Sequence, residues 1–291
     1  MTWKRVATAL VLIPVVVGLV LFTPTWAVAA ATAVITVLAL WEYFALGEAI
    51  GHRAYRVWTL LCAVYVIFCS WTEGRSPSEF RHGVSTVSGF LRHIPAITRW
   101  PIGYFFVFVL GLAALTLWSK RPLVEALPSI GISTSGFLLV AFPLSFAVLL
   151  HGEYPFGPQY LLFALVITWA GDTAAYFVGR AIGKHAFAPH ISPKKTWEGS
   201  VGSMVGSLLV AWGFSYWIRM PIGHLLAMAV IGNVAGQMGD LLESAYKRSA
   251  GVKDSGGLLP GHGGVLDRID ALILCIPVIW YYVVLVNPGT I

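Results

Sequence analysis

One stretch near the end of the chain, residues 239–270, concentrates the side chains that could do chemistry. It holds five of the thirteen acidic residues: Asp240, Glu243, Asp254, Asp267 and Asp270. It also holds a set of basic and imidazole side chains: Lys247, Arg248, Lys253, Arg268 and His262. Long apolar runs flank the stretch on both sides. Because charge beside hydrocarbon is costly, this two-signed cluster predicts a functional site, and its composition favours a metal-assisted reaction on phosphates.

A predicted helix over residues 225–246 carries four polar side chains on one face, at positions i, i+3, i+4 and i+7: Asp240, Glu243, Ser244 and Lys247. A solvated helix end would show the same spacing. Here, however, Asn233 and Gln237 extend the polar character one and two turns deeper. Polar groups on membrane helices usually face the bundle interior, so the face predicts a site rather than a solvated end.

Asp267 and Asp270 are spaced i, i+3 at the start of the last apolar run. Helix capping would explain one acid there. Two acids, with Asp240 meeting them across the bundle, predict an oxygen-rich site for a hard cation such as Mg²⁺. Arg268 cannot ligate a metal but can hold a phosphate through two hydrogen bonds.

Two further segments predict anion binding. The glycine-rich link 256–264 is either a flexible loop or a segment whose backbone N–H groups approach an anion. In segment 191–199, Ser192 and Pro193 predict a helix start, which places Lys194 and Lys195 in the first turn, against the helix dipole. A bound anion would offset that mismatch. The alternative is a lysine pair that only orients the protein in the membrane. Asp172, in the preceding run, needs a partner, a cation or a proton, and all three remain open.

The elements that position these groups are membrane helices. Of the 291 residues, 57% are hydrophobic and only 11% are charged, with a mean hydropathy of +0.78. Soluble domains carry roughly 25% charged residues, so lipid must cover much of this surface. The apolar runs are continuous rather than alternating, which favours helices over strands. The three cysteines lie inside apolar runs and predict small core or lipid-facing residues, not disulfides or metal ligands.

The fold class expected is an all-α integral membrane protein, a polytopic bundle of about nine transmembrane helices. The predicted spans are 6–22, 26–46, 57–71, 102–118, 130–150, 160–178, 201–218, 225–246 and 271–286. The first span lacks a convincing cleavage site, so a retained helix is predicted rather than a signal peptide. With the N-terminus inside, 14 of the 19 basic residues fall on inner segments. Four of the five exceptions share the loop 72–101, which is the weak point of this map and could contain an interfacial helix.

This charge distribution predicts a multi-pass protein of the cell inner (plasma) membrane, with a cytoplasmic N-terminus and the active site on the cytoplasmic side. The same distribution accounts for the net charge of +6, so the positive charge does not require a nucleic acid partner. Two parts are expected: residues 1–150 form about five spans with almost no charge, Glu42 excepted, and residues 151–291 form the catalytic part. Glycine pairs at helix-contact spacing mark the second part: Gly179/Gly183, Gly202/Gly206 and Gly232/Gly236.

A long pattern of fixed spacing resembles the signature of phosphatidate cytidylyltransferases, also called CDP-diacylglycerol synthases. It reads Ser244-x-x-Lys247-Arg248-x4-Lys253-Asp254, then Leu259-Pro260-Gly261-His262-Gly263-Gly264-x-x-Asp267-Arg268-x-Asp270. The likeness extends upstream through residues 192–199 and Asp172-x3-Tyr176-x2-Gly179-Arg180, so it covers roughly the C-terminal half. Ala271 departs from the pattern, since many members have Ser or Thr there.

The resemblance implies transfer of CMP from CTP to phosphatidate in the lipid bilayer, with no nucleic acid partner; a homodimer is left open. It implies catalytic roles for Asp240, Asp267, Asp270, Lys247 and Arg268, of which the three aspartates would hold the metal. The predicted substrate-binding residues are Lys194, Lys195, Thr196, Glu198, Ser244, Arg248, Lys253, Asp254, His262, Gly263 and Gly264.

Three alternatives are distinguishable. A phospholipid transporter would place its charges near the membrane midplane rather than at one face. A CDP-alcohol phosphotransferase would carry a D-G-x-x-A-R motif, which is absent from this sequence. A cytidylyltransferase acting on another lipid phosphate, such as a polyprenyl phosphate, is separated only by assay of the product.

Overall fold

The computed structural model describes residues 2–73, 101–153, 155–258 and 263–286, and their side chains from residue 11 onward except at positions 101 and 102. Nearly all of this is helical. The helices are α1 (Thr2–Phe22), α2 (Thr25–Ala49), α3 (Arg56–Glu73), α5 (Pro101–Trp118), the 3₁₀ turn η3 (Leu123–Glu125), α6 (Ala126–Gly136), the π-helical turn η4 (Phe137–Ala141), α7 (Phe142–Gly152), α8 (Gly157–Ile182), α9 (Trp197–Phe214), α10 (Ile222–Ser249) and α11 (Leu266–Val286). Two short strands, β1 (Ala186–Ala188) and β2 (Ser192–Thr196), form an antiparallel hairpin between α8 and α9.

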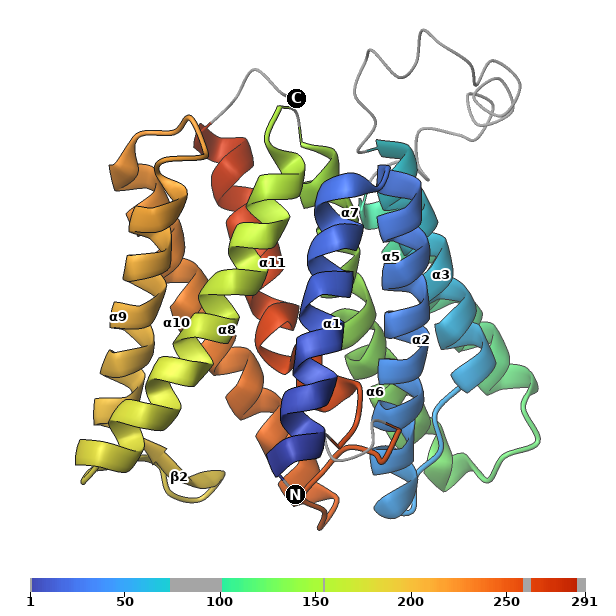
Figure 1. Cartoon of the computed structure of the whole chain (residues 1–291). Helices are drawn as coiled ribbons and strands as arrows, with labels where there is room; N and C mark the ends of the chain where they lie inside the picture. Colours follow the sequence, from blue (N-terminus) through green and yellow to red (C-terminus); the bar gives the residue numbers. More distant parts are fainter. Residues whose placement is uncertain (1, 74–100, 154, 259–262, 287–291) are drawn as a thin grey trace, which may run out of the picture.

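The helices run roughly parallel to one another and form a single bundle (Figure 1). The helix α1 begins at the lower end of this view, and α11 ends at the upper end. The β hairpin and the turn that leads into α11 both lie at the lower end. The all-α prediction therefore holds apart from one hairpin, and that hairpin lies at the same end of the bundle as the segment after α10.

Each predicted span coincides with helix in the structure, but their ends differ. The helix α9 begins and ends four residues before the predicted span 201–218, and α10 continues past residue 246 to Ser249. Within the described residues, five helices are long and apolar enough to cross a membrane, namely α2, the continuous η3–α7 segment, α8, α10 and α11. This is the composition of a multi-pass membrane protein, while the count of nine crossings stays a prediction. Most of the loop 72–101 lies outside the described residues.

The buried core is continuous from the N-terminal helices to α11. Cys62, Cys69 and Cys275 are free and buried within it, in agreement with the prediction. The two halves of the chain thus share one apolar interior, in which α11 packs against both α7 and α2.

Small residues set the separation of α8 and α9, as the glycine spacing predicts. A Cβ added to Gly202 would lie 2.7 Å from the Cβ of Val178, and one added to Gly206 would lie 2.9 Å from that of Ala174. Both distances are shorter than real Cβ contacts, so these glycines are required for the close approach. This packing fixes α8 beside α9, and both helices contribute residues to the site described next.

Candidate active site

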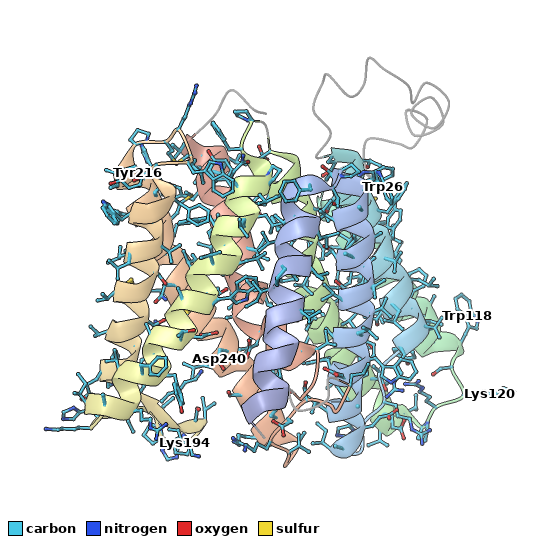
Figure 2. All side chains as sticks on the ribbon, in the orientation of Figure 1. Trp26, Trp118, Lys120, Lys194, Tyr216 and Asp240 are labelled. Atoms are coloured by element: carbon cyan, nitrogen blue, oxygen red, sulfur yellow. The ribbon has the colours of Figure 1, made fainter. Side chains whose placement is uncertain are left out.

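A cavity of about 620 Å³ opens between α8, α9, α10 and the β hairpin. Most of its chemistry comes from acidic, basic and hydroxyl side chains: Asp172, Tyr176, Arg180, Lys194, Lys195, Thr196, Ser200, Ser203, Gln237 and Asp240. Figure 2 shows Lys194 near the lower end of the bundle and Asp240 above it. The structure therefore brings the predicted lysine pair and the first predicted acid into one pocket, although they are more than forty residues apart in sequence.

The lysine pair lies on strand β2, not in a helix. The predicted helix start at Ser192 is wrong, because β2 spans Ser192–Thr196 and α9 begins at Trp197. Thr196 is the N-cap, and its hydroxyl accepts a hydrogen bond from the Gly199 N–H at 3.1 Å. This start agrees better with the helix dipole, since the first turn then holds an acid, Glu198, and no lysine.

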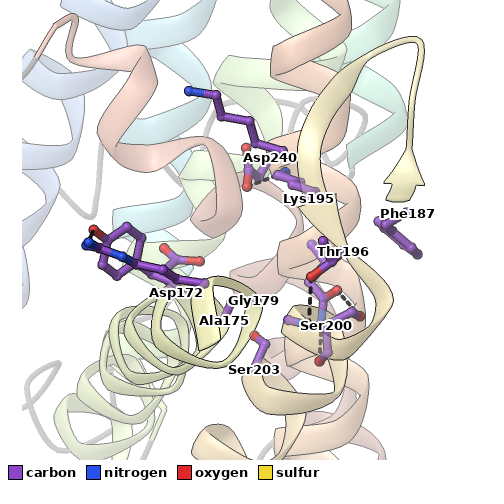
Figure 3. Close-up of a pocket in the computed structure, with 14 residues that line it drawn as sticks. Asp172, Ala175, Gly179, Phe187, Lys195, Thr196, Ser200, Ser203 and Asp240 are labelled. Atoms are coloured by element: carbon purple, nitrogen blue, oxygen red, sulfur yellow. Dashed lines mark hydrogen bonds and ion pairs between the residues drawn. The ribbon is translucent and has the colours of Figure 1, made fainter. Parts of the chain in front are cut away.

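Asp240 on α10 forms an ion pair with Lys195 on β2 (Figure 3). Both side chains are about 30% exposed, so a ligand in the cavity can reach them. Asp240 lies inside its helix, because α10 continues for more than two turns beyond it, to Ser249. The continuation is supported by an ion pair at i, i+4 between Glu243 and Lys247, with 2.5 Å between Oε2 and Nζ.

Two more carboxylates act on Asp240. The charge of Asp172 on α8 repels that of Asp240, and Asp270 on α11 is repelled by both. The charges of Lys195 and Arg268 attract Asp172 in turn. Carboxylates from α8, α10 and α11 thus interact through their charges, and two of them, Asp172 and Asp240, line the cavity. Asp172 therefore has charges of both signs nearby.

A polar ladder joins α9 to α10 next to this cluster. Ser200 Oγ donates to Gln237 Oε1 at 2.5 Å, Gln237 Nε2 donates to Asn233 Oδ1 at 2.6 Å, and Asn233 Nδ2 donates to Ser203 and Ser207 at 2.8 Å each. The prediction included Asn233 and Gln237 but missed the serines. The sequence does contain a pattern that could have revealed the serines. Their spacing of i, i+3 and i+7 places all three on one face of α9.

Asp267 takes a different place from the one predicted. Its Oδ1 accepts from Lys247 Nζ at 2.6 Å, and its Oδ2 accepts from the N–H groups of Ser255 and Gly264 at 3.0 and 2.7 Å. Gly263 has φ +78°, and a Cβ there would lie 2.7 Å from Oδ2, so only glycine fits beside this carboxylate. Asp267 therefore orders the segment before α11, and the structure joins it to Lys247 rather than to Asp240.

Cations at the mouth of a cavity, with carboxylates on its wall, can bind a polyphosphate and neutralise charge that develops on it. The sequence comparison specifies the chemistry further: residues 3–286 match the Cytidylyltransferase family. The chain belongs to this family. The match covers the N-terminal helices as well as the C-terminal half that carries the recognised signature.

Three relatives show how the likeness is distributed. A phosphatidate cytidylyltransferase of Haemophilus influenzae is 33% identical over 290 residues, which is 96% of this chain and 97% of the relative. One of Bacillus subtilis is 38% identical over 158 residues, or 54% of this chain and 59% of the relative. One of Staphylococcus aureus is 46% identical over 125 residues, which is 42% of this chain and 48% of the relative. The chain is thus similar to cytidylyltransferases along its whole length, with higher identity over shorter stretches.

The other predicted substrate-binding side chains that the structure describes are not among the residues that line the cavity. Arg248 Nε donates to the carbonyl of Ile191 at 3.3 Å, which ties α10 to the β hairpin. Glu198 pairs with His185 at 2.6 Å, Ser244 is buried, and Lys253 and Asp254 are exposed. His262 lies outside the described residues. Among the described residues, no three His, Cys, Asp or Glu side chains are arranged so that they could hold a metal ion, so the metal assignment stays a prediction.

Proposed function

We propose that this chain transfers CMP from CTP to phosphatidate, giving CDP-diacylglycerol and pyrophosphate, and so serves phospholipid biosynthesis. One observation carries the proposal. The chain aligns along 96% of its length with a phosphatidate cytidylyltransferase, and it places two lysines and two acids, Asp172 and Asp240, in one cavity of a membrane bundle. A lipid phosphate held in the bilayer and a nucleotide from water could meet in such a cavity.

The reaction needs charge neutralisation more than it needs a base. An ionised phosphate oxygen of phosphatidate attacks the α-phosphorus of CTP, a new P–O bond forms, and the bond to pyrophosphate breaks. Both reactants are anions, so cations must reduce their repulsion and hold them in line. Lys194, Lys195 and Arg180 line the cavity and suit this role. Lys247 and Arg268 belong to the same proposal, as groups that stabilise the charge of the leaving pyrophosphate.

Mg²⁺ fits the side chains on the α10–α11 wall. Asp240 and Asp270 offer carboxylate oxygens, the donor type this ion prefers, and their mutual repulsion would be relieved by a cation. We assign these two acids to the metal, with K⁺ as a second cation. Asp267, the third ligand predicted from the sequence, already accepts hydrogen bonds from Lys247 and two backbone N–H groups. The bound ion would supply a positive charge that polarises a phosphoryl oxygen.

The inner-membrane location and the cytoplasmic N-terminus belong to the proposal. They would place the lower end of the bundle, with the β hairpin and Lys194, toward the water that contains CTP. The positive-inside distribution of lysine and arginine supports this orientation.

The test is direct. Purified protein in phospholipid–detergent micelles is incubated with CTP labelled at the α-phosphate, Mg²⁺ and phosphatidate, and the lipid product is identified. We expect labelled CDP-diacylglycerol and an equal amount of pyrophosphate. A parallel reaction with a polyprenyl phosphate tests the alternative acceptor. Turnover of the polyprenyl phosphate alone would replace phosphatidate in the proposal, and no turnover of any lipid phosphate would refute it.

A further inference from the structure

Glu42 is a charged residue within the apolar helices of the N-terminal half, and its side chain is only 3% exposed. It lies on α2, yet its partners are more than two hundred residues away. Oε2 accepts from Ser255 Oγ at 3.0 Å and from the Leu266 N–H at 2.8 Å, and Oε1 accepts from the Val265 N–H at 3.0 Å. A buried carboxylate is costly unless donors surround it, and here three donors do.

The fit around this carboxylate is close. A Cβ added to Gly256 would lie 2.5 Å from Oε1 of Glu42, and one added to Gly264 would lie 2.3 Å from Oε2. These two glycines lie near the ends of the glycine-rich link. The structure therefore explains two of its glycines by contact with Glu42 rather than by flexibility or by contact with an anion.

The donors from the backbone are the first N–H groups of α11. Leu266 is the first residue of that helix, and N–H groups in this position lack partners within the helix. A negative charge there also interacts favourably with the helix dipole. Glu42 therefore caps α11 from a different helix and fixes where α11 begins.

The same segment holds the acids of the site. Ser255 donates its hydroxyl to Glu42 and its N–H to Asp267, and Gly264 packs on Glu42 while its N–H donates to Asp267. Asp270 follows Asp267 by three residues, so the start of α11 also sets the place of Asp270 against Asp240. A displacement of the Glu42 carboxylate would therefore also displace Asp267 and Asp270.

We propose that Glu42 is a positioning residue for the cytidylyltransferase site, holding Ser255, Val265 and Leu266 so that Asp267 engages Lys247 and the charge of Asp270 interacts with that of Asp240. This inference rests on the function proposed above. Glu42 is not among the residues that line the cavity. It acts through the backbone, and it joins the N-terminal helices, which carry no part of the recognised signature, to the catalytic acids.

The principal test is Glu42→Gln, which keeps the shape and puts an NH₂ group where one acceptor was, facing an N–H of α11. We expect kcat to fall about 10- to 100-fold, while KM for CTP changes less than about threefold, because the substrate-binding lysines stay in place. Glu48→Gln is the matched control. It makes the same change on the same helix, but Glu48 is exposed and pairs with Arg56 at 2.7 Å. Its kcat should equal that of the unmodified protein.

Ser255→Ala supplies a second, milder variant in case Glu42→Gln does not fold. It removes one donor to Glu42 and should lower kcat severalfold. The double variant should lose no more than Glu42→Gln alone, because both changes act on the same contact. Hydrogen exchange should rise in residues 255–266 of both single variants and stay unchanged in α8 and α9.

The outcomes separate this proposal from the proposed function. No CDP-diacylglycerol from the unmodified protein would refute the function. An active protein in which Glu42→Gln and Ser255→Ala both keep kcat would refute the positioning role alone. Losses that match the unfolded fraction, with hydrogen exchange in 255–266 unchanged in the folded part, would reduce Glu42 to a stabilising contact and overturn the proposal as well.

Discussion

At the scale of single residues, two of the three acids that the sequence assigns to the metal differ in the partners that their carboxylates already have. Asp240 is partly exposed in the cavity and pairs with Lys195, whereas both oxygens of Asp267 already accept hydrogen bonds from protein donors. A carboxylate that is fully engaged by Lys247 and two N–H groups is a poor metal ligand unless those donors move. The structure therefore favours Asp240 over Asp267 as the ligand.

A pair of amide variants tests this difference. Asp240→Asn should lower turnover by at least about two orders of magnitude, the scale of losing a principal electrostatic element, and should raise the Mg²⁺ concentration needed for half-maximal rate. Asp267→Asn should also lower turnover about a hundredfold, but its half-maximal Mg²⁺ concentration should stay unchanged. Rates measured across a Mg²⁺ titration decide the matter. A raised requirement in Asp267→Asn would restore Asp267 to the metal site, and near-normal rates in both variants at low Mg²⁺ would contradict any such site here.

The two lysines of β2 also differ in their contacts. Lys194 is exposed on β2, while Lys195 pairs with Asp240. Lys194→Ala should raise KM for CTP or phosphatidate about tenfold with little change in kcat, since it removes one charge-assisted contact to a substrate anion. Lys195→Ala should lower kcat as well, because Asp240 loses its partner. Steady-state kinetics with each substrate varied in turn would show this split, and unchanged constants for both variants would leave the pair with a purely topogenic role.

At the scale of elements, the approach of α10 to α11 decides whether the acids meet. Gly239 precedes Asp240, and a Cβ there would lie 2.4 Å from the backbone carbonyl of Asp270. A backbone atom cannot move aside as a flexible side chain can. The glycine therefore lets the two helices come close enough for Asp240 and Asp270 to interact.

Gly239→Ala should separate the two helices and reduce stability by about 1–3 kcal/mol, the usual cost of overpacking. The rate should fall further than the folded fraction does, since the acids move apart. Thermal unfolding in detergent and specific activity, measured on the same preparation, give both quantities. Gly213→Ala on α9 is the control, because a Cβ there meets nothing within 4 Å. Equal stability and equal specific activity of the two variants would show that the close contact at Gly239 does not position the acids.

Helices and small-residue contacts could be predicted because apolar runs and glycine spacing encode them directly. The cavity could be predicted only in part. Residues 192–196 were expected in a helix, because serine followed by proline is a common helix start, yet strand pairing with residues 186–188 prevailed. The partner of Asp267 was missed for a different reason. Asp240 and Lys247 lie two turns apart on one helix, and spacing alone does not tell which of them a carboxylate from another helix will meet.

At the scale of the whole molecule, the two halves are less separate than their composition suggests. The N-terminal helices contain little charge, which predicted a separate hydrophobic part. In the structure they share one core with α8–α11, and α2 sends Glu42 to the start of α11. A contact between residues this distant in sequence has no periodicity that could reveal it. The isolated charge in an apolar helix was the signal available, and it indicated only that a partner must exist.

The final prediction concerns how the molecule crosses the membrane. The helix α1 begins at one end of the bundle and α11 ends at the other, as an odd number of crossings requires (Figure 1). A reporter fused after Ile291 should therefore lie on the side opposite to one placed before α1, outside the cell if the N-terminus is cytoplasmic. Paired fusions to a cytoplasm-active and a periplasm-active enzyme measure this. A cytoplasmic reporter at Ile291, together with a cytoplasmic N-terminus, would require an even number of crossings and place the error most plainly in the loop 72–101.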